Sequence, residues 1–289
     1  MSQGKQRGSA WSIKLALWVY KILGYKVIYY LQYPIAFFYF LVAKNAKEPL
    51  KIYYKHLNIK FSNKIYYGHL RIFAVCLLDR FISKINPENY SFKYENIERS
   101  QEVLKSGSIL VFSHFGGWAS SLSTTCVANK INIVMQEVMM EGIQEIEKDM
   151  NSESRPHIID LNHGPISVSI QIANALMNEE IVAMMADRIT NAKSIIEVSF
   201  LGQKARFNKN PFTIAYKTTK PIVVFFVILK GMQAYEIEDI IIHLDKSKSE
   251  EEATKEACIQ YVKKYEEIVR KHPEQWFNLF DFWDKKILK

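Results

Sequence analysis

From residue 108 onward, short apolar runs alternate with amphipathic stretches, and this alternation limits the possible folds more than any other feature of the sequence. The runs are rich in Ile, Val and Phe, which favour strands. Between them, apolar residues recur at steps of three and four, as is typical of helices. Strands that alternate with helices form largely parallel sheets covered on both faces. We therefore predict an α/β fold with a mostly parallel central sheet flanked by helices. The predicted strands are Ser108–Ser113, Asn132–Gln136, His157–Leu161, Ile181–Ala186, Ile195–Phe200, Pro221–Leu229 and Tyr235–His243, and the predicted helices lie within 50–84 and at 117–129, 166–178, 211–219 and 250–271.

The N-terminal part of the chain differs from the rest in charge and in aromatic content. The chain has a net charge of +8, yet its first 60 residues carry ten Lys or Arg and a single acidic residue, Glu48. Trp, Tyr and Phe are interleaved with these cations from Trp11 to Phe40. Such a segment is too apolar for a solvated nucleic-acid-binding arm. An anionic membrane surface is the better partner, because Trp and Tyr prefer the headgroup level and Lys pairs with anionic lipid.

Seventeen consecutive uncharged residues, Val27 to Ala43, lie between Lys26 and Lys44. This length is the lower limit for crossing a hydrocarbon core of about 30 Å, and Pro34 interrupts it. Three arrangements stay open, namely a helical hairpin in the membrane interface, a single span and a buried helix. We expect a membrane-associated helical segment over residues 1–50 and an α/β domain over residues 51–289.

Cysteine and histidine spacing gives no sign of a metal site or a disulfide framework. Cys76, Cys126 and Cys258 lie far apart, with no CxxC pair. Widely spaced cysteines of this kind fit a reducing compartment. We predict no bound metal.

The turn after the first predicted strand of the sheet is the leading candidate for chemistry. In Ser113-His114-Phe115-Gly116-Gly117-Trp118, an imidazole is followed by two glycines and then a predicted helix. Ligands of parallel sheets lie at the carboxyl ends of strands. We expect His114 to act as a general base, with the N–H groups around Gly116 and Gly117 stabilising an oxyanion. The alternative is a structural histidine beside a simple turn.

Two further turns carry charged residues. Asp187 and Arg188 follow an apolar strand, where the acid serves either chemistry or an Asx turn. Lys204 and Arg206 precede Pro211, which can open a helix as its first residue. Cations near a helix amino end can hold a phosphate or carboxylate, although solvated surface charge is the alternative.

Taken in order, these segments resemble the lysophospholipid acyltransferase-like superfamily, and within it the branch of the late acyltransferases of lipid A biosynthesis. The resemblance runs from Trp11 to Trp283. The segments that carry it are Leu78-Asp79-Arg80, the His114 turn, Ala186-Asp187-Arg188, Phe200-Leu201-Gly202 to Pro211-Phe212, and Trp276 to Trp283. For the last of these, whose bulky aromatics are typical of a core, we expect core packing.

This resemblance implies transfer of a fatty acyl group from a thioester, on acyl carrier protein or coenzyme A, to a hydroxyl or amine of a membrane lipid. A lipid A precursor or a lysophospholipid would be the acceptor, and the cytoplasmic face of the bacterial inner membrane the location, with the chain peripheral or single-pass. No cofactor is implied beyond the acyl thioester. The family pattern is His, four residues, then Asp or Glu. His114 matches the first position, but Ala119 stands where the acid is expected.

The missing acid leaves several interpretations. Asp187, at a neighbouring strand end, is the replacement that we favour, because a carboxylate fixes the imidazole tautomer and stabilises the imidazolium. Arg188, Lys204 and Arg206 would hold an anionic head group, and Ser120 would bind the acceptor or orient His114, unless it only caps a helix. The alternative function is a lipid-binding relative that is catalytically weak or inactive.

Overall fold

The computed structural model describes residues 10–94, 97–121, 130–136, 156–189 and 191–284. Its centre is a sheet of seven strands in the order β1-β9-β8-β2-β5-β3-β4. Neighbouring strands run parallel except for the pair β8–β9. The predicted α/β class and mostly parallel sheet are therefore confirmed. The strands of this sheet are β1 (Ser91–Tyr94), β2 (Ile109–Phe112), β3 (Ile131–Met135), β4 (His157–Asp160), β5 (Ile181–Met185), β8 (Ile222–Gly231) and β9 (Ala234–Ile242).

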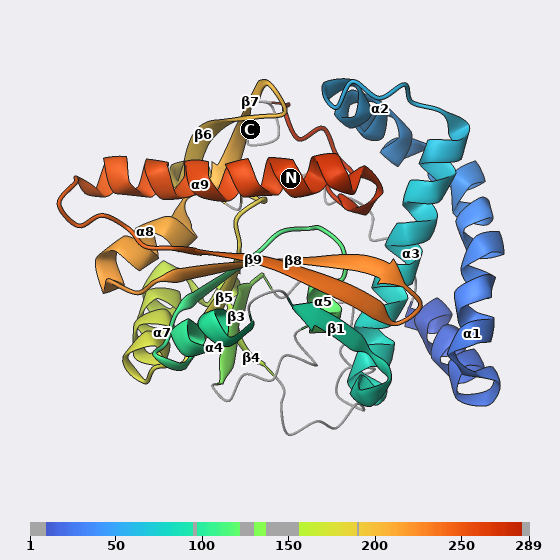
Figure 1. Cartoon of the computed structure of the whole chain (residues 1–289), viewed down its shortest axis with the longest axis horizontal. Coiled ribbons are helices and arrows are strands. Elements are labelled where there is room, and N and C mark those ends of the chain that lie inside the picture. The colour runs from blue at the N-terminus through green and yellow to red at the C-terminus, as the bar shows by residue number, and fades with distance from the viewer. Residues whose placement is uncertain (1–9, 95–96, 122–129, 137–155, 190, 285–289) are drawn as a thin grey trace.

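Helices cover both faces of the sheet (Figure 1). They are α1 (Ala10–Val42), α2 (Lys47–His56), α3 (Asn63–Ile85), α4 (Ile97–Lys105), α5 (Trp118–Ser121), α7 (Pro165–Met177), α8 (Asn210–Thr218) and α9 (Glu250–Lys271). Side chains of β2 point alternately to the two faces, as the pleat of a strand requires. Ile109 and Val111 join the core under α8 and α9, whereas Leu110 and Phe112 join the core under α1, α3 and α4.

The ends of α9 show why this segment is helical. Ser249 and Glu252 form a reciprocal capping box at its start, which satisfies amide groups that have no partner inside the helix. Acidic residues occupy the first turn, and Arg270 and Lys271 the last, and both placements complement the helix dipole. Its inward face buries Tyr261 and Tyr265, so α9 places two phenol groups against the sheet.

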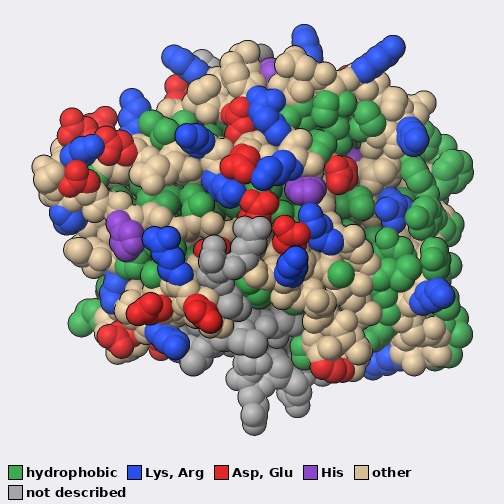
Figure 2. All heavy atoms as spheres, viewed as in Figure 1, with side chains coloured by type: hydrophobic (Ala, Val, Ile, Leu, Met, Phe, Trp, Pro, Cys, Tyr) green, Lys and Arg blue, Asp and Glu red, His purple; other side chains and the backbone are tan. Residues whose placement is uncertain are grey.

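The long helix α1 is kinked and attached to α3 by tyrosines. The kink lies at Gly24, where φ is +76°, and the helix continues through Pro34. Tyr20 donates a hydrogen bond to Asn86, and Tyr25 to Asp79. The face turned away from α3 exposes many large apolar side chains (Figure 2), including Trp11, Trp18, Ile22, Leu23, Phe37, Phe38 and Leu41. The segment is therefore not a fully buried helix.

By length and composition, none of the described helices alone is apolar enough over a sufficient length to cross a membrane. One pair of helices, 11–42 and 44–56, passes the same test when both are taken together, with a bend of 80° between them.

The segment with Lys204 and Arg206 differs from the prediction. It is one arm of a hairpin, β6 (Ile195–Phe200) paired with β7 (Gln203–Asn208). The helix expected after it is present, since α8 begins at Asn210 with Pro211 in its first turn. Leu201 and Gly202 form its two-residue loop, both with positive φ, as hairpin turns of the primed type require. In β7, Ala205 and Phe207 are buried while Lys204 is exposed. This period of two marks a strand.

Candidate active site

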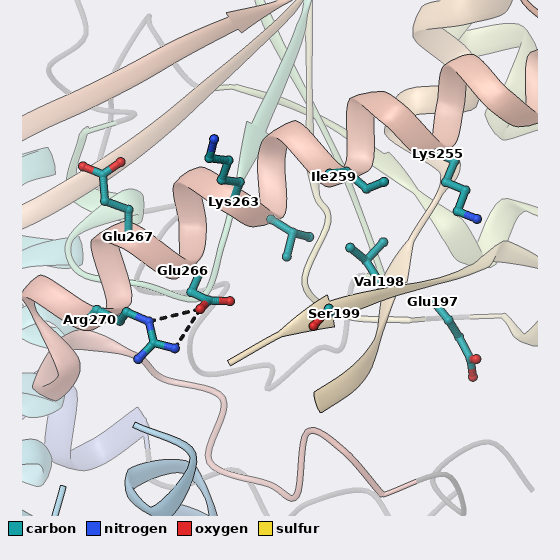
Figure 3. A pocket seen from close by; sticks show the side chains of 10 residues that line it. Glu197, Val198, Ser199, Lys255, Ile259, Lys263, Glu266, Glu267 and Arg270 are labelled. Carbon is teal, nitrogen blue, oxygen red and sulfur yellow. Dashed lines mark hydrogen bonds and ion pairs between the residues drawn. The ribbon is translucent and has the colours of Figure 1, made fainter. Parts of the chain in front are cut away.

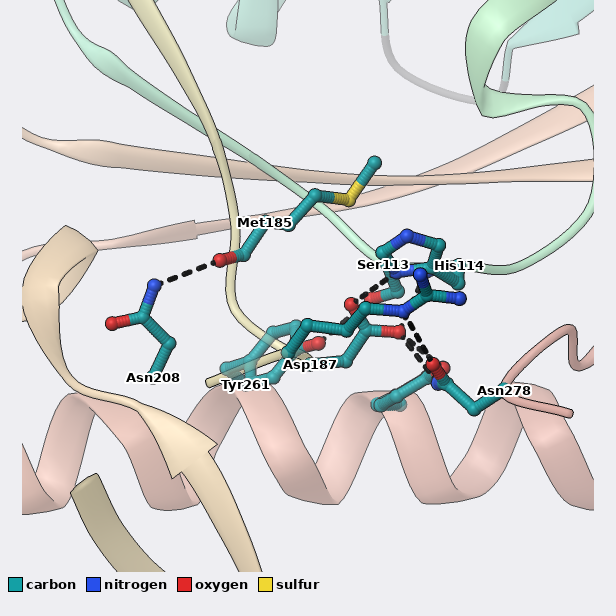
Figure 4. Close-up of polar contacts among 9 residues, drawn as sticks. Ser113, His114, Met185, Asp187, Asn208, Tyr261 and Asn278 are labelled. Carbon is teal, nitrogen blue, oxygen red and sulfur yellow. Dashed lines mark hydrogen bonds and ion pairs between the residues drawn. The ribbon is translucent and has the colours of Figure 1, made fainter. Parts of the chain in front are cut away.

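His114 and Asp187 occupy equivalent positions after two neighbouring strands. β2 and β5 are parallel, with Phe112 opposite Met185, so each residue lies two positions beyond that pair. The Nδ1 atom of His114 lies 2.9 Å from Oδ1 of Asp187, and the backbone N–H of His114 donates to Oδ2 at 2.7 Å (Figure 4). The structure thus brings the candidate base and the candidate acid into direct contact.

The environment of Asp187 fixes the protonation of the pair. The Asp187 side chain has no exposed surface, whereas that of His114 is 20% exposed. Burial raises the pKa of Asp187, but His114, the Arg188 cation and the amide of Asn278 outweigh it and hold this pKa at about 2. An ionised carboxylate only accepts hydrogen bonds. His114 Nδ1 therefore carries a proton, which leaves the lone pair of a neutral imidazole on Nε2.

Two further side chains, Asn278 and Tyr265, complete the shell around the carboxylate. Asn278 Nδ2 donates to Asp187 Oδ2 at 2.8 Å, and the Tyr265 hydroxyl donates to the same oxygen at 3.2 Å. Asn278 also accepts from Arg188 Nε at 3.2 Å. The sequence did not predict a role for either residue, because neither follows a strand of the sheet. Only the family-like segment Trp276 to Trp283, which contains Asn278, pointed to this region.

The two glycines after His114 serve packing rather than anion binding. Gly116 N–H donates to the Gln275 carbonyl and Gly117 N–H to the Val227 carbonyl, both at 2.9 Å. The amides of Gly116 and Gly117 themselves are therefore not available to an oxyanion, because both already have backbone partners. A Cβ atom on Gly116 would lie 1.9 Å from the Val227 carbonyl oxygen, and one on Gly117 would lie 2.2 Å from Tyr235 Cε1. Glycine is required here by close approach.

Comparison with known families agrees with this geometry. A family model described as bacterial lipid A biosynthesis acyltransferase matches residues 6–285, nearly the whole chain. The chain belongs to this family. The resemblance seen in the sequence is thereby confirmed, and membership implies acyl transfer to a lipid. A search of curated proteins finds no match.

In this member of the lipid A acyltransferase family, the other predicted site residues lie in several different elements. Ala119 lies in α5, beyond the glycine turn, and is partly exposed. Ser120 is completely buried, so its side chain is not accessible from the surface, and its predicted contact with the acceptor or with His114 stays a prediction. Arg206 pairs with Glu197 across the hairpin, Nε to Oε1 at 3.2 Å. Lys204 lies on the same strand, and this strand ends two residues before α8 begins.

Arg188, by contrast, stays next to the pair of His114 and Asp187. It is exposed, and its guanidinium carbon lies 5.7 Å from the centre of the Phe280 ring, within the range of a cation–π contact. Among the described residues we find no partner for its two Nη groups. Two other residues weighed for the turn, Ser123 and Cys126, lie outside the described residues.

The expected core packing of the C-terminal aromatic segment is confirmed. Trp276, Phe277 and Phe282 are buried. Trp276 stacks on Tyr53 with ring centres 4.2 Å apart, and its backbone forms an antiparallel bridge with Phe115. The segment therefore packs against the His114 turn.

A shallow groove on the outer side of α9 is separate from this site (Figure 3). Lys255, Ile259, Lys263 and Arg270 line it together with Val198 of β6. Tyr265, which contacts Asp187, is not part of this lining. Within the part of the chain that the structure describes, no three His, Cys, Asp or Glu side chains lie close enough to hold a metal ion.

Proposed function

We propose that this chain transfers a fatty acyl group from an acyl thioester to a hydroxyl or amine of a membrane lipid, with His114 as the general base. The acyl thioester is carried by acyl carrier protein or coenzyme A, and the acceptor is a lipid A precursor or a lysophospholipid. The observation that carries this proposal is the contact of 2.9 Å between His114 Nδ1 and Asp187 Oδ1 in a member of the lipid A acyltransferase family.

In the proposed reaction, Nε2 of His114 takes the proton of the acceptor hydroxyl as its oxygen attacks the thioester carbonyl. The tetrahedral intermediate then collapses, the C–S bond breaks, and the imidazolium returns the proton to the leaving thiolate. No covalent enzyme intermediate and no resident cofactor take part. The role of Asp187 is to hold the Nδ1–H tautomer and to stabilise the imidazolium.

Asp187 thus takes the place of the acid that is absent at Ala119. Its carboxylate reaches both the ring and the backbone N–H of His114, so it fixes the imidazole at two points. Its pKa of about 2 keeps it charged near neutral pH. A charged partner is what a base needs when it becomes cationic in the transition state.

Arg188 is the cation that we assign to an anionic group of the substrate. It follows Asp187 directly, is exposed, and lies beside the pair through Asn278. An arginine with two available Nη groups suits a phosphate or carboxylate, because the planar fork can donate two parallel hydrogen bonds. In this proposal Lys204 and Arg206 have no part in binding.

The exposed apolar face of α1, interleaved with lysines, supports a location at the cytoplasmic face of the inner membrane. Trp11, Trp18 and Phe38 are 70%, 60% and 58% exposed, which is unfavourable in water and suits the interface of a bilayer. Such a helix would bring the site to lipid reactants that do not leave the membrane.

The test is acyl transfer by the purified chain with vesicles that contain the acceptor and a labelled acyl thioester. His114→Ala should remove turnover, and Asp187→Asn should lower kcat by roughly 10³–10⁴-fold, as for a misplaced imidazole tautomer. His163→Ala, an exposed histidine in another part of the chain, is the matched control and should keep full activity. Lipid binding without turnover, unchanged in His114→Ala, would instead identify an inactive lipid-binding relative.

A further inference from the structure

Asn278 holds two oppositely charged neighbours at the candidate site. Its side chain is fully buried. Nδ2 donates to Asp187 Oδ2 at 2.8 Å, and Oδ1 accepts from Arg188 Nε at 3.2 Å. The amide therefore presents its donor to the anion and its acceptor to the cation, an orientation that satisfies both.

Arg188 and Asp187 are adjacent in the chain, and both contact this one amide, yet they form no ion pair with each other among the described contacts. A direct pair would be costly for the site in two ways. The guanidinium would compete with the His114 ring for the carboxylate, and the carboxylate would occupy the donors of Arg188 that an anionic substrate needs. A neutral group between them prevents both losses.

The backbone of Asn278 is held in place by the segment that precedes it. Phe277 N–H donates to the His114 carbonyl at 2.7 Å, and the Gln275 carbonyl accepts from Gly116 N–H. This segment therefore runs beside the turn that carries His114. These backbone hydrogen bonds hold the Asn278 side chain in position beside Asp187.

We propose that Asn278 is a positioning residue that separates Arg188 from Asp187, so that Asp187 serves His114 and Arg188 serves an anionic group of the substrate. This inference rests on the proposed function. It adds a residue from the far C-terminal part of the chain, which acts through its neighbours rather than by touching the reacting atoms.

The spectroscopic test uses the His114 Nδ1 proton, observed by NMR in protein with ¹⁵N-labelled histidine. The wild-type chain should show a downfield Nδ1–H signal, assigned by its loss in His114→Ala. In Asn278→Ala, Arg188 becomes free to pair with Asp187, so the signal should shift or disappear. In Asn278→Ala combined with Arg188→Ala the competitor is gone, and the signal should return.

Two further variants keep the test decisive. Asn278→Asp keeps the shape of the side chain and an acceptor for Arg188 but places a second carboxylate beside Asp187. Two carboxylates that share a site also share a proton, so the His114 signal should move here as well, and this variant serves if Asn278→Ala does not fold. Gln275→Ala removes a buried amide of the same segment that bonds to Leu229 and not to Asp187. It should lower stability and leave the signal unchanged.

Turnover gives the second readout. We expect kcat of Asn278→Ala to fall by roughly 10–100-fold, the usual effect of losing an orienting partner. A wild-type Nδ1–H signal in both Asn278 variants would overturn the inference, and so would a signal that stays absent in the double variant. The NMR results hold even if wild-type protein transfers no acyl group, so failure of the proposed function and failure of this inference are distinguishable.

Discussion

Asp79 is a buried carboxylate that is not part of the His114 pair, and its titration should make the free energy of unfolding depend on pH. It has no exposed surface and accepts hydrogen bonds from the hydroxyls of Tyr25, Tyr90 and Tyr235. Burial raises its pKa from 3.8 to about 6, although the three hydroxyls act in the opposite direction. The pKa values of these tyrosines and of the neighbouring Cys76 thiol are all raised, so those groups stay neutral while Asp79 titrates.

The magnitude follows from the difference between the folded and unfolded pKa. At about 1.4 kcal/mol for each tenfold change in an equilibrium constant, a rise from 3.8 to about 6 amounts to about 3 kcal/mol in total. Because the folded pKa is the higher one, this stability is fully present below pH 3.8 and is lost as the pH rises through about 6. Roughly 1.3 kcal/mol of it falls between pH 5 and pH 7.

The perturbation is Asp79→Asn, which removes the titration and keeps the shape of the side chain. The free energies of unfolding of both proteins would be measured by denaturant titration with tryptophan fluorescence at pH 5, 6 and 7. His69 opposes Asp79 over the same range, because burial lowers its pKa to about 4. Its contribution is common to both proteins and cancels in their difference.

We expect the stability of Asp79→Asn relative to wild type to increase by about 1.3 kcal/mol from pH 5 to pH 7. A constant offset between the two proteins would only reflect the altered hydrogen bonds to the tyrosines. A difference that stays flat within about 0.3 kcal/mol, well below the expected change, or that decreases with pH, would refute a buried carboxylate with a raised pKa.

Three other predictions concern packing, capping and the membrane. Gly117→Ala should destabilise by about 1–3 kcal/mol, because the added methyl group overlaps the buried Tyr235 ring. Gly116→Ala should destabilise by more, because its methyl group overlaps a backbone carbonyl and its φ is positive; the melting temperatures of the two variants test this order. Ser249→Ala removes the capping box of α9 and should cost about 1 kcal/mol in denaturant titrations. Anionic vesicles should shift the fluorescence of Trp18 to the blue in a variant that retains only this tryptophan, more strongly at low than at high salt; no shift would contradict an interfacial α1.

Much of the sheet could be predicted because its strands are locally encoded. The apolar runs of β2, β5 and β8 are strongly β-forming, and β6 spans the predicted residues. By contrast, β1 is only four residues long, with no run of apolar residues, and its position depends on pairing with β9. β7 was interpreted as a turn because four of its six residues are polar or charged, and only Ala205 and Phe207 are apolar.

The candidate site divides in the same way. The contact between His114 and Asp187 could be predicted, because parallel neighbours end at the same edge of a sheet. The engagement of the Gly116 and Gly117 amides could not, since their partners lie at Val227 and Gln275, far along the chain. The contact of Asn278 with Asp187 could not be predicted for the same reason. A side chain 91 residues from Asp187 meets it only through tertiary packing.

Ala119 shows that the spacing of a sequence motif is only one way to bring a carboxylate close to a histidine. What an imidazole requires is a carboxylate at Nδ1, and an acid one helical turn beyond the histidine is one way to place it. Here the carboxylate of Asp187 follows β5, which neighbours β2 in the sheet, and its position depends on the register of β2 against β5. A slip by one residue would move Asp187 by about 3.3 Å and turn its side chain to the other face. The hydrogen bonds of a buried parallel pair prevent that slip, so the sheet fixes the position of the Asp187 carboxylate beside His114 Nδ1.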